Sequence, residues 1–213
     1  MSQKAYSFPN WRGAGIGIAA AVSLALANSV AFAGSVNTQA AQLFELQAEF
    51  HGAATVHDPV NGDSAGVIDQ RIRDMLALWT SDGSITLEVG GARDGDYSGL
   101  GDPSDPASCP TPSADPSNRG TLCTFFKYVA GSFQAANKFV SLAPSYKTNF
   151  SIHGNDASVY FECHYFNVAV DPMTGLPLWK AVSHVTFDGT AQKVDGTWLF
   201  LHSDARVVGV PVP

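Results

Sequence analysis

The chain has 213 residues, of which 45% are hydrophobic and 15% are charged, and its formal net charge is -7. This length and apolar content favour a single domain built around one substantial core. The negative charge argues against nucleic acid and anionic membrane surfaces as partners, because a polyanion would be repelled.

The first 33 residues are predicted to be a cleavable signal peptide. Lys4 and Arg12 precede an apolar, small-residue run over residues 13–33, which ends in the triplet Ala-Phe-Ala that is typical of signal peptidase sites. We expect cleavage after Ala33, a periplasmic or secreted product, and no stable membrane insertion afterwards. An uncleaved anchor is the alternative, but glycine and serine residues dilute the run below what a spanning helix requires.

Two helices and a strand are predicted in the first half of the remaining chain. Residues 34–39 form a short polar linker, and residues 40–57 repeat apolar side chains at helical spacing until Asp58, which precedes a proline. Residues 67–79 repeat the same period up to an Asp-Gly stop. Residues 84–89 alternate in polarity and predict a strand.

Residues 90–121 contain glycine, proline, aspartate and serine at a density that predicts a long loop with one short strand near Tyr97. Cys109 and Cys123 bracket part of this loop, and in an exported protein we expect them to form a disulfide. An ordered loop of this length is either a lid over a binding site or a surface loop without a role in binding, and the sequence fits both interpretations. Cys163 falls within a strand and is expected to remain a buried thiol.

The last part of the chain is predicted to form a third helix followed by four long strands. Phe125 or Phe126, Val129 and Phe133 mark the helix. The strands cover residues 145–153, 157–170, 178–194 and 197–208. Their connections contain the hairpin pairs Gly154-Asn155, Thr174-Gly175 and Asp195-Gly196. Helices first and strands last predict an α+β domain over residues 40–213, with a curled antiparallel sheet wrapped around about three helices.

The order of these elements resembles the cone-shaped nuclear transport factor 2-like fold, in its SnoaL-like branch. The likeness spans residues 40–208 and rests on Phe50 with Asp58, on Trp79 before Asp82, and on the runs YKTNFSIHGNDA and Asp-Gly-Thr-Trp. Members of this fold hold a ligand in the mouth of the cone and include dehydratases, isomerases, dehydrochlorinases and lyases. The resemblance therefore implies a pocket rather than one particular chemistry, and it makes a homodimer an expectation.

Catalytic members of this branch pair an aspartate at the end of the first helix with a histidine four residues before a strand asparagine. In this chain Asp58 matches the first position, but Ser145 occupies the second. The resemblance therefore implies an incomplete dyad, in which His184 or His57 would have to supply the base. Tyr146 is either a pocket hydroxyl that orients a carbonyl or a phenol, or an ordinary aromatic residue whose hydroxyl reaches water.

We predict an exported domain that binds a small apolar or aromatic molecule in a cone lined by Phe, Tyr and Trp. If the domain is an enzyme, it is expected to be a cofactor-free lyase, dehydratase or isomerase that works by proton transfer. The expected catalytic residues are Asp58, His184 and Tyr146, and the expected ligand-binding residues are His57, Trp79, Asn149 and Phe133. The alternative is a non-catalytic ligand-binding or dimeric interaction module of the same fold.

Each candidate residue also has a structural interpretation. Asp58 lies in an Asp-Pro-x-Asn-Gly context and is also a turn former. His184 lies on a strand of which neither face is clearly more apolar, so it fits the outer face equally well, and His164 is expected to face solvent or a dimer contact. No metal site is expected, because the sequence has neither paired histidines at helical spacing, nor Cys-x-x-Cys, nor a calcium-loop pattern.

Overall fold

The computed structural model describes residues 23–58, 61–128, 139–141 and 147–209 of the chain. Two structural units are distinguished, residues 1–35 and residues 36–213. Helix α1 (Ser23–Ala54) begins in the first unit, so the predicted linker at residues 34–39 is helical instead. Within the described residues, no helix is long and apolar enough to span a membrane. Cleavage after Ala33 stays a prediction.

The second unit contains helices followed by a run of long strands, as predicted for an α+β domain. Its elements in chain order after α1 are α2 (Ala65–Leu76), β1 (Trp79–Val89), β2 (Ala92–Ser98), η1 (Pro106–Ser108), α3 (Leu122–Phe126), β3 (Phe139–Ser141), β4 (Lys147–His153), β5 (Asp156–Val170), β6 (Pro177–Val194) and β7 (Thr197–Gly209). The strands from β4 to β7 closely match the four predicted ones, and β2 contains the predicted short strand near Tyr97.

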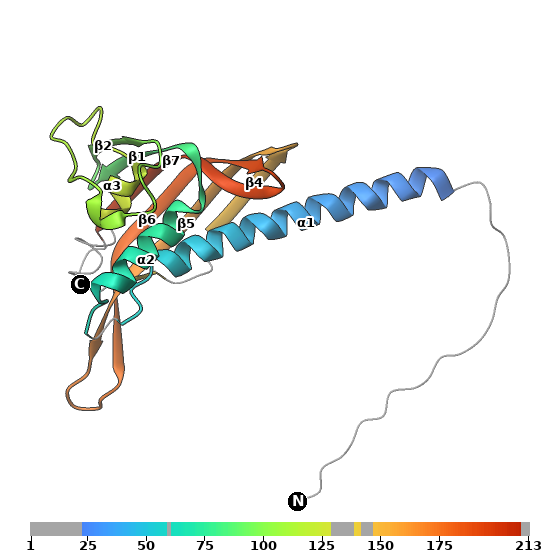
Figure 1. The fold of residues 1–213 in the computed structure, drawn as a ribbon. Helices are drawn as coiled ribbons and strands as arrows, with labels where there is room; N and C mark the ends of the chain where they lie inside the picture. The colour runs from blue at the N-terminus through green and yellow to red at the C-terminus, as the bar shows by residue number, and fades with distance from the viewer. Residues whose placement is uncertain (1–22, 59–60, 129–138, 142–146, 210–213) are drawn as a thin grey trace, which may run out of the picture. The chain divides into compact units, whose positions relative to one another are not determined.

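The described strands form one open, curled sheet in the order β2-β1-β7-β6-β5-β3, with β4 also paired to β5 (Figure 1). Every neighbouring pair is antiparallel except β1 and β7, which run parallel. The sheet is therefore mixed, whereas the sequence predicted an antiparallel one. A parallel pair requires a long crossover connection, and here the whole segment from β2 to β6 separates the two strands.

Two predicted hairpin turns owe their geometry to residues with positive φ. Asp195 and Gly196 join β6 to β7 with φ values of 50° and 87°, as a type I′ turn requires. Gly154 has a φ of 67° at the turn from β4 to β5. Both turns match the right-handed twist of the flanking strands, so they help to fix the register of the sheet.

Trp79 is the first residue of β1, although the sequence predicted it on the second helix. Helix α2 ends at Leu76, and the backbone amide of Phe200 on β7 donates a hydrogen bond of 2.8 Å to the carbonyl of Leu78. Trp79 is then paired with Phe200 in the sheet. This long-range pairing overrides the local helical spacing, because tertiary context outweighs local propensity.

The core lies between the helices and one face of the sheet, which we call the inner face. An aromatic cluster forms its centre, in which Phe187 on β6 stacks on Phe161 on β5 with ring centroids 4.4 Å apart. The ring of Phe187 also contacts those of Phe50, Trp79 and Phe200 at 5.0 to 6.1 Å. Helix α1 contributes Phe50 to this cluster, so packing of aromatic rings joins α1 to the inner face.

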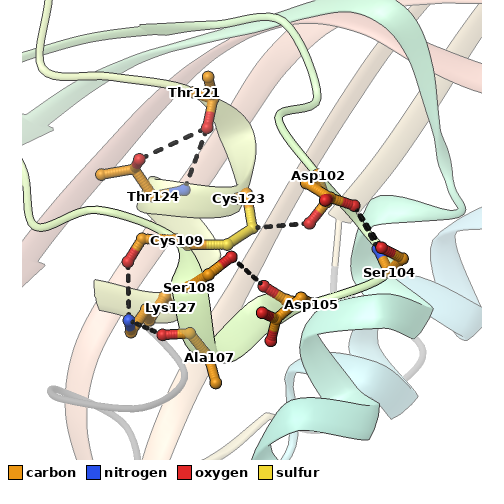
Figure 2. The surroundings of a disulfide bond; sticks show 10 residues. All are labelled: Asp102, Ser104, Asp105, Ala107, Ser108, Cys109, Thr121, Cys123, Thr124 and Lys127. Carbon is orange, nitrogen blue, oxygen red and sulfur yellow. Dashed lines mark hydrogen bonds between the residues drawn. A yellow bond between two sulfur atoms is a disulfide. The ribbon is translucent and has the colours of Figure 1, made fainter.

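The predicted disulfide between Cys109 and Cys123 is present and ties the end of η1 to α3 (Figure 2). Lys127 strengthens the same junction, since its ammonium donates hydrogen bonds of 2.6 and 2.7 Å to the carbonyls of Ala107 and Cys109. The backbone amide of Cys123 also donates to the carbonyl of Leu100 at 2.9 Å. The segment between β2 and α3 is thus ordered by a covalent bond and by backbone contacts.

Candidate functional site

A cavity of about 150 Å³ lies between the helices and the inner face of the sheet. It is lined by Phe50, Ala54, Met75, Ile85, Leu87, Val89, Phe125, Phe126, Tyr128, Phe161, Cys163, Tyr165, Ser183, Val185, Phe187, Ala205 and Val207. Among these described lining residues there is no carboxylate, no imidazole and no cationic side chain. The cavity is therefore suited to an uncharged, mainly apolar molecule.

The alternation of side chains along two central strands builds one wall of the cavity. Successive side chains of a strand point to opposite faces, so every second residue of β5 and of β6 faces inward. The inward pairs across the two strands are Phe161 with Phe187, Cys163 with Val185, and Tyr165 with Ser183. The wall thus changes from purely aromatic at one end to partly polar at the other.

Ser183 is a polar lining residue on the inward side of β6. The residue is only 6% exposed, and within the described part of the chain its Oγ makes no hydrogen bond. Cys163, beside it on the neighbouring strand, is 3% exposed and forms no disulfide, as predicted. Tyr128 is 38% exposed, so solvent reaches that part of the lining.

Asp58, the predicted catalytic acid, follows the end of α1 and does not line this cavity. Its carboxylate accepts hydrogen bonds of 2.9 Å from the backbone amide and from the side-chain Nδ2 of Asn61. Its own amide donates to Asp63 Oδ1 at 2.9 Å, and so does the amide of His57, an exposed residue, at 2.8 Å. These contacts are those of a turn former, the structural interpretation of the Asp-Pro-x-Asn-Gly motif.

His184, the predicted base, lies on the outer face of the sheet. Its neighbours Ser183 and Val185 line the cavity, so the period of two turns His184 away from it. The Nε2 atom of His184 is 3.2 Å from Glu162 Oε2, and its ring lies 5.4 Å from that of His164, which shares the outer face as predicted. Asp58 and His184 therefore do not meet in the cavity as an acid-base pair.

The other predicted ligand-binding residues do not line the cavity either. Trp79 is 2% exposed and packs into the core, with its ring 5.3 Å from that of Phe200. Asn149 is exposed on β4, because the alternation of that strand turns Phe150 and not Asn149 toward the core. Tyr146 and Phe133 lie outside the described residues. The structure thus supports the predicted pocket, but it builds that pocket from other side chains.

A buried ion pair between Arg71 and Asp63 fixes the end of α1, and sequence reasoning missed it. Arg71 Nη1 lies 2.6 Å from Asp63 Oδ2, and both side chains are at most 1% exposed. Arg71 also donates to the last carbonyls of α1, from Nε to Ala53 at 2.9 Å and from Nη2 to Ala54 at 2.7 Å. It therefore caps the helix that carries Ala54 into the cavity wall. The signal in the sequence was its position beside Ile72 on the apolar stripe of α2.

His51 on α1 is a second buried polar residue that the sequence interpretation missed. It is 1% exposed, and its ring lies 5.3 Å from that of Phe161 in the cavity wall. Burial lowers the pKa of His51 from 6.5 to about 4, because the charged imidazolium would lose its hydration. The spacing from Leu43 through Gln47 to His51 follows the helical stripe, so periodicity was a signal for the burial of both polar residues.

The low pKa of His51 predicts that the fold loses stability as the pH falls. The unfolded chain binds a proton at its ordinary pKa of about 6.5, whereas the native state takes it up only near 4. Stability due to His51 is therefore fully present above pH 6.5 and is lost between pH 6.5 and 4, on the order of 2 kcal/mol at pH 5. Urea unfolding across this range should show the loss for the wild type and for His57→Leu, but a flatter profile for His51→Leu. Equal slopes in all three proteins would contradict it.

Metal binding has no support in the described geometry. No group of three or more His, Cys, Asp or Glu residues within the part of the chain that the structure describes is arranged to hold a metal ion. On the outer face, Glu162 lies 2.7 Å from Lys147 Nζ and 3.2 Å from His184 Nε2, so its contacts are those of a surface charge network.

No known family model and no curated protein matches the sequence of this chain. Solved structures do match it: a nuclear transport factor 2-like protein with a cystatin-like fold from Novosphingobium aromaticivorans superposes with a TM-score of 0.50 at 12% identity, covering 87% of this chain and 91% of that one. A proposed scytalone dehydratase from the same organism gives a TM-score of 0.47 at 9% identity, with 86% and 89% covered. A Mycobacterium tuberculosis protein of unknown function gives 0.47 at 13% identity, with 84% and 76% covered. At identities this low the likeness is one of fold alone.

Proposed function

We propose that this chain, which has the nuclear transport factor 2-like fold, binds a small neutral apolar molecule in its inner cavity. The observation that carries the proposal is the partly open, mainly apolar cavity between the helices and the sheet. A cavity of about 150 Å³ is of the size that holds benzene in an engineered protein interior. A molecule with one aromatic ring is therefore the best fit.

Binding without proton transfer is the function that the geometry supports best. An acid-base enzyme needs a group in the site that exchanges a proton near neutral pH, usually a histidine or a carboxylate. The described lining residues offer only hydroxyl groups and a thiol, whose ordinary pKa values lie above neutrality. The carboxylate of Asp58 is held by Asn61, and His184 lies on the outer face.

Toluene binding tests the proposed function. Val185→Phe adds a ring to the middle of the cavity wall and is expected to weaken toluene binding by about tenfold or more, because the ring fills the space that the ligand needs. Thr186→Phe is the matched control, since it adds the same ring to the next residue on the opposite face and should leave the affinity unchanged. Titration calorimetry measures both. A wild-type protein that binds no toluene, or a Val185→Phe protein that binds it normally, would refute the proposal.

We also propose that the protein acts after export. The small-residue run before Gly34 and the Cys109–Cys123 disulfide support this, since structural disulfides persist mainly in oxidising compartments. The mass of the protein recovered from the periplasm or the medium should correspond to a chain that begins at Gly34. A mass that includes the first 33 residues would argue for an uncleaved anchor.

A further inference from the structure

We propose that the ligand carries one neutral hydroxyl or carbonyl group, which forms a hydrogen bond with Ser183 Oγ. The inference rests on the proposed function, that the cavity binds a small apolar molecule, and it narrows the chemical class of that molecule. Its basis is a serine hydroxyl that borders a mainly apolar cavity.

The hydroxyl of Ser183 borders the cavity and has no hydrogen-bond partner among the described residues. Ser183 is 6% exposed, lies on the inward side of β6 with Val185 and Phe187, and makes no side-chain hydrogen bond to any described residue. A ligand that fills the cavity would separate this hydroxyl from water, and a buried hydroxyl left without a partner costs about 1–3 kcal/mol. The empty space beside Ser183 is where a partner from a ligand would lie.

A second buried serine shows why the cavity matters. Ser203 on β7 is 0% exposed, and its Oγ also lacks a hydrogen-bond partner, but it does not line the cavity. No ligand in the cavity would be expected to reach it. Of these two serine hydroxyls, only that of Ser183 borders space that a small molecule can occupy.

The surroundings of Ser183 determine the kind of group it can recognise. A serine hydroxyl both donates and accepts, so it pairs with a hydroxyl or with a carbonyl. The described lining residues include no charged side chain, so an anionic or cationic group would lose its hydration without an ionic partner. Together with the cavity volume, this points to a one-ring phenol, alcohol, ketone or aldehyde and excludes carboxylates and amines in their charged forms.

Three ligands that differ in one group test this inference: toluene, p-cresol and p-toluate. Their affinities would be measured by titration calorimetry for the wild type, Ser183→Ala and the control Ser203→Ala. We expect Ser183→Ala to weaken p-cresol binding by about fivefold or more, because its hydroxyl would be buried without a partner, and to leave toluene within about twofold. Ser203→Ala should change neither ligand, and p-toluate should bind weakly to all three proteins. Ser183→Cys, which keeps the shape but only a weak donor, should show the same selective loss if the alanine variant does not fold.

The outcomes separate the two proposals. Selective loss of p-cresol affinity in the Ser183 variants supports the hydrogen bond. If toluene and p-cresol both bind the wild type and their affinity ratio is the same in every variant, the cavity binds ligands but the role of Ser183 is wrong. Preferential binding of p-toluate would also overturn the neutral-ligand inference. If neither toluene nor p-cresol binds the wild type, the proposed function fails as well.

Discussion

Replacing Arg71 by methionine is expected to lower the free energy of unfolding by about 3–5 kcal/mol, because it leaves a buried carboxylate without its partner. Asp63 is 1% exposed in its side chain, and its Oδ2 lies 2.6 Å from Arg71 Nη1. The substitution also removes the two hydrogen bonds that Arg71 donates to the carbonyls of Ala53 and Ala54. Methionine fills much of the same volume, so the loss would reflect charge and hydrogen bonding more than packing.

Arg73 provides the matched control on the same helix. It is less buried, and its Nη1 contacts Gln70 Oε1 at 3.3 Å on the exposed side of α2. Arg73→Met should therefore change the free energy of unfolding by less than about 0.5 kcal/mol. Urea unfolding monitored by tryptophan fluorescence measures both variants. Similar free energies of unfolding for the two variants would show that the buried ion pair and the helix cap do not stabilise the fold.

Removing the charge of Asp63 as well should recover part of the stability lost in Arg71→Met. Asp63→Asn keeps the oxygen that accepts hydrogen bonds from the amides of His57 and Asp58. The double variant therefore no longer buries an uncompensated charge, although the carbonyls of α1 still lack their donor. A double variant more stable than Arg71→Met indicates coupling between the two residues.

The C-terminal part of the fold could be predicted because its determinants are local. The alternation of side chains along β4 to β7 involves residues that are close together in the sequence. The same is true of the turn residues Gly154, Asp195 and Gly196. The start of β1 could not be predicted, because Trp79 pairs with Phe200, which lies on a strand far along the chain. The parallel pairing of β1 with β7 was missed for the same reason.

The site was harder to predict than the fold, because a cavity is the space that several elements leave unfilled. Seven elements contribute to its wall, and no local sequence pattern shows where their side chains leave space between them. For β6, both alternating sets of residues have similar polarity, so the pattern did not decide whether Ser183 or His184 faces inward. Resemblance favoured Asp58, but a neighbouring Asn61 uses its carboxylate locally.

The second large effect is expected from Phe187→Ala, which should lower the free energy of unfolding by about 3–5 kcal/mol. Phe187 is 3% exposed and lies at the centre of the aromatic cluster, stacked on Phe161 and in contact with Phe200. Phe44→Ala is the control, because that ring is 49% exposed although it contacts Phe150 at 4.9 Å. Its loss should cost about 1 kcal/mol or less, since little apolar surface is removed from the core.

Phe187→Ala should also change which ligands the protein accepts, because Phe187 forms part of the cavity wall. Loss of the ring adds its volume to the cavity, and an apolar cavity within a rigid core tends to stay open and bind apolar molecules. A two-ring molecule such as naphthalene should therefore raise the melting temperature of Phe187→Ala more than that of the wild type, since a ligand that binds only the native state stabilises it. Toluene should stabilise both proteins. If naphthalene raises neither melting temperature, the core has collapsed into the space left by the ring. In that case, packing of α1, β5 and β6 does not keep the cavity open.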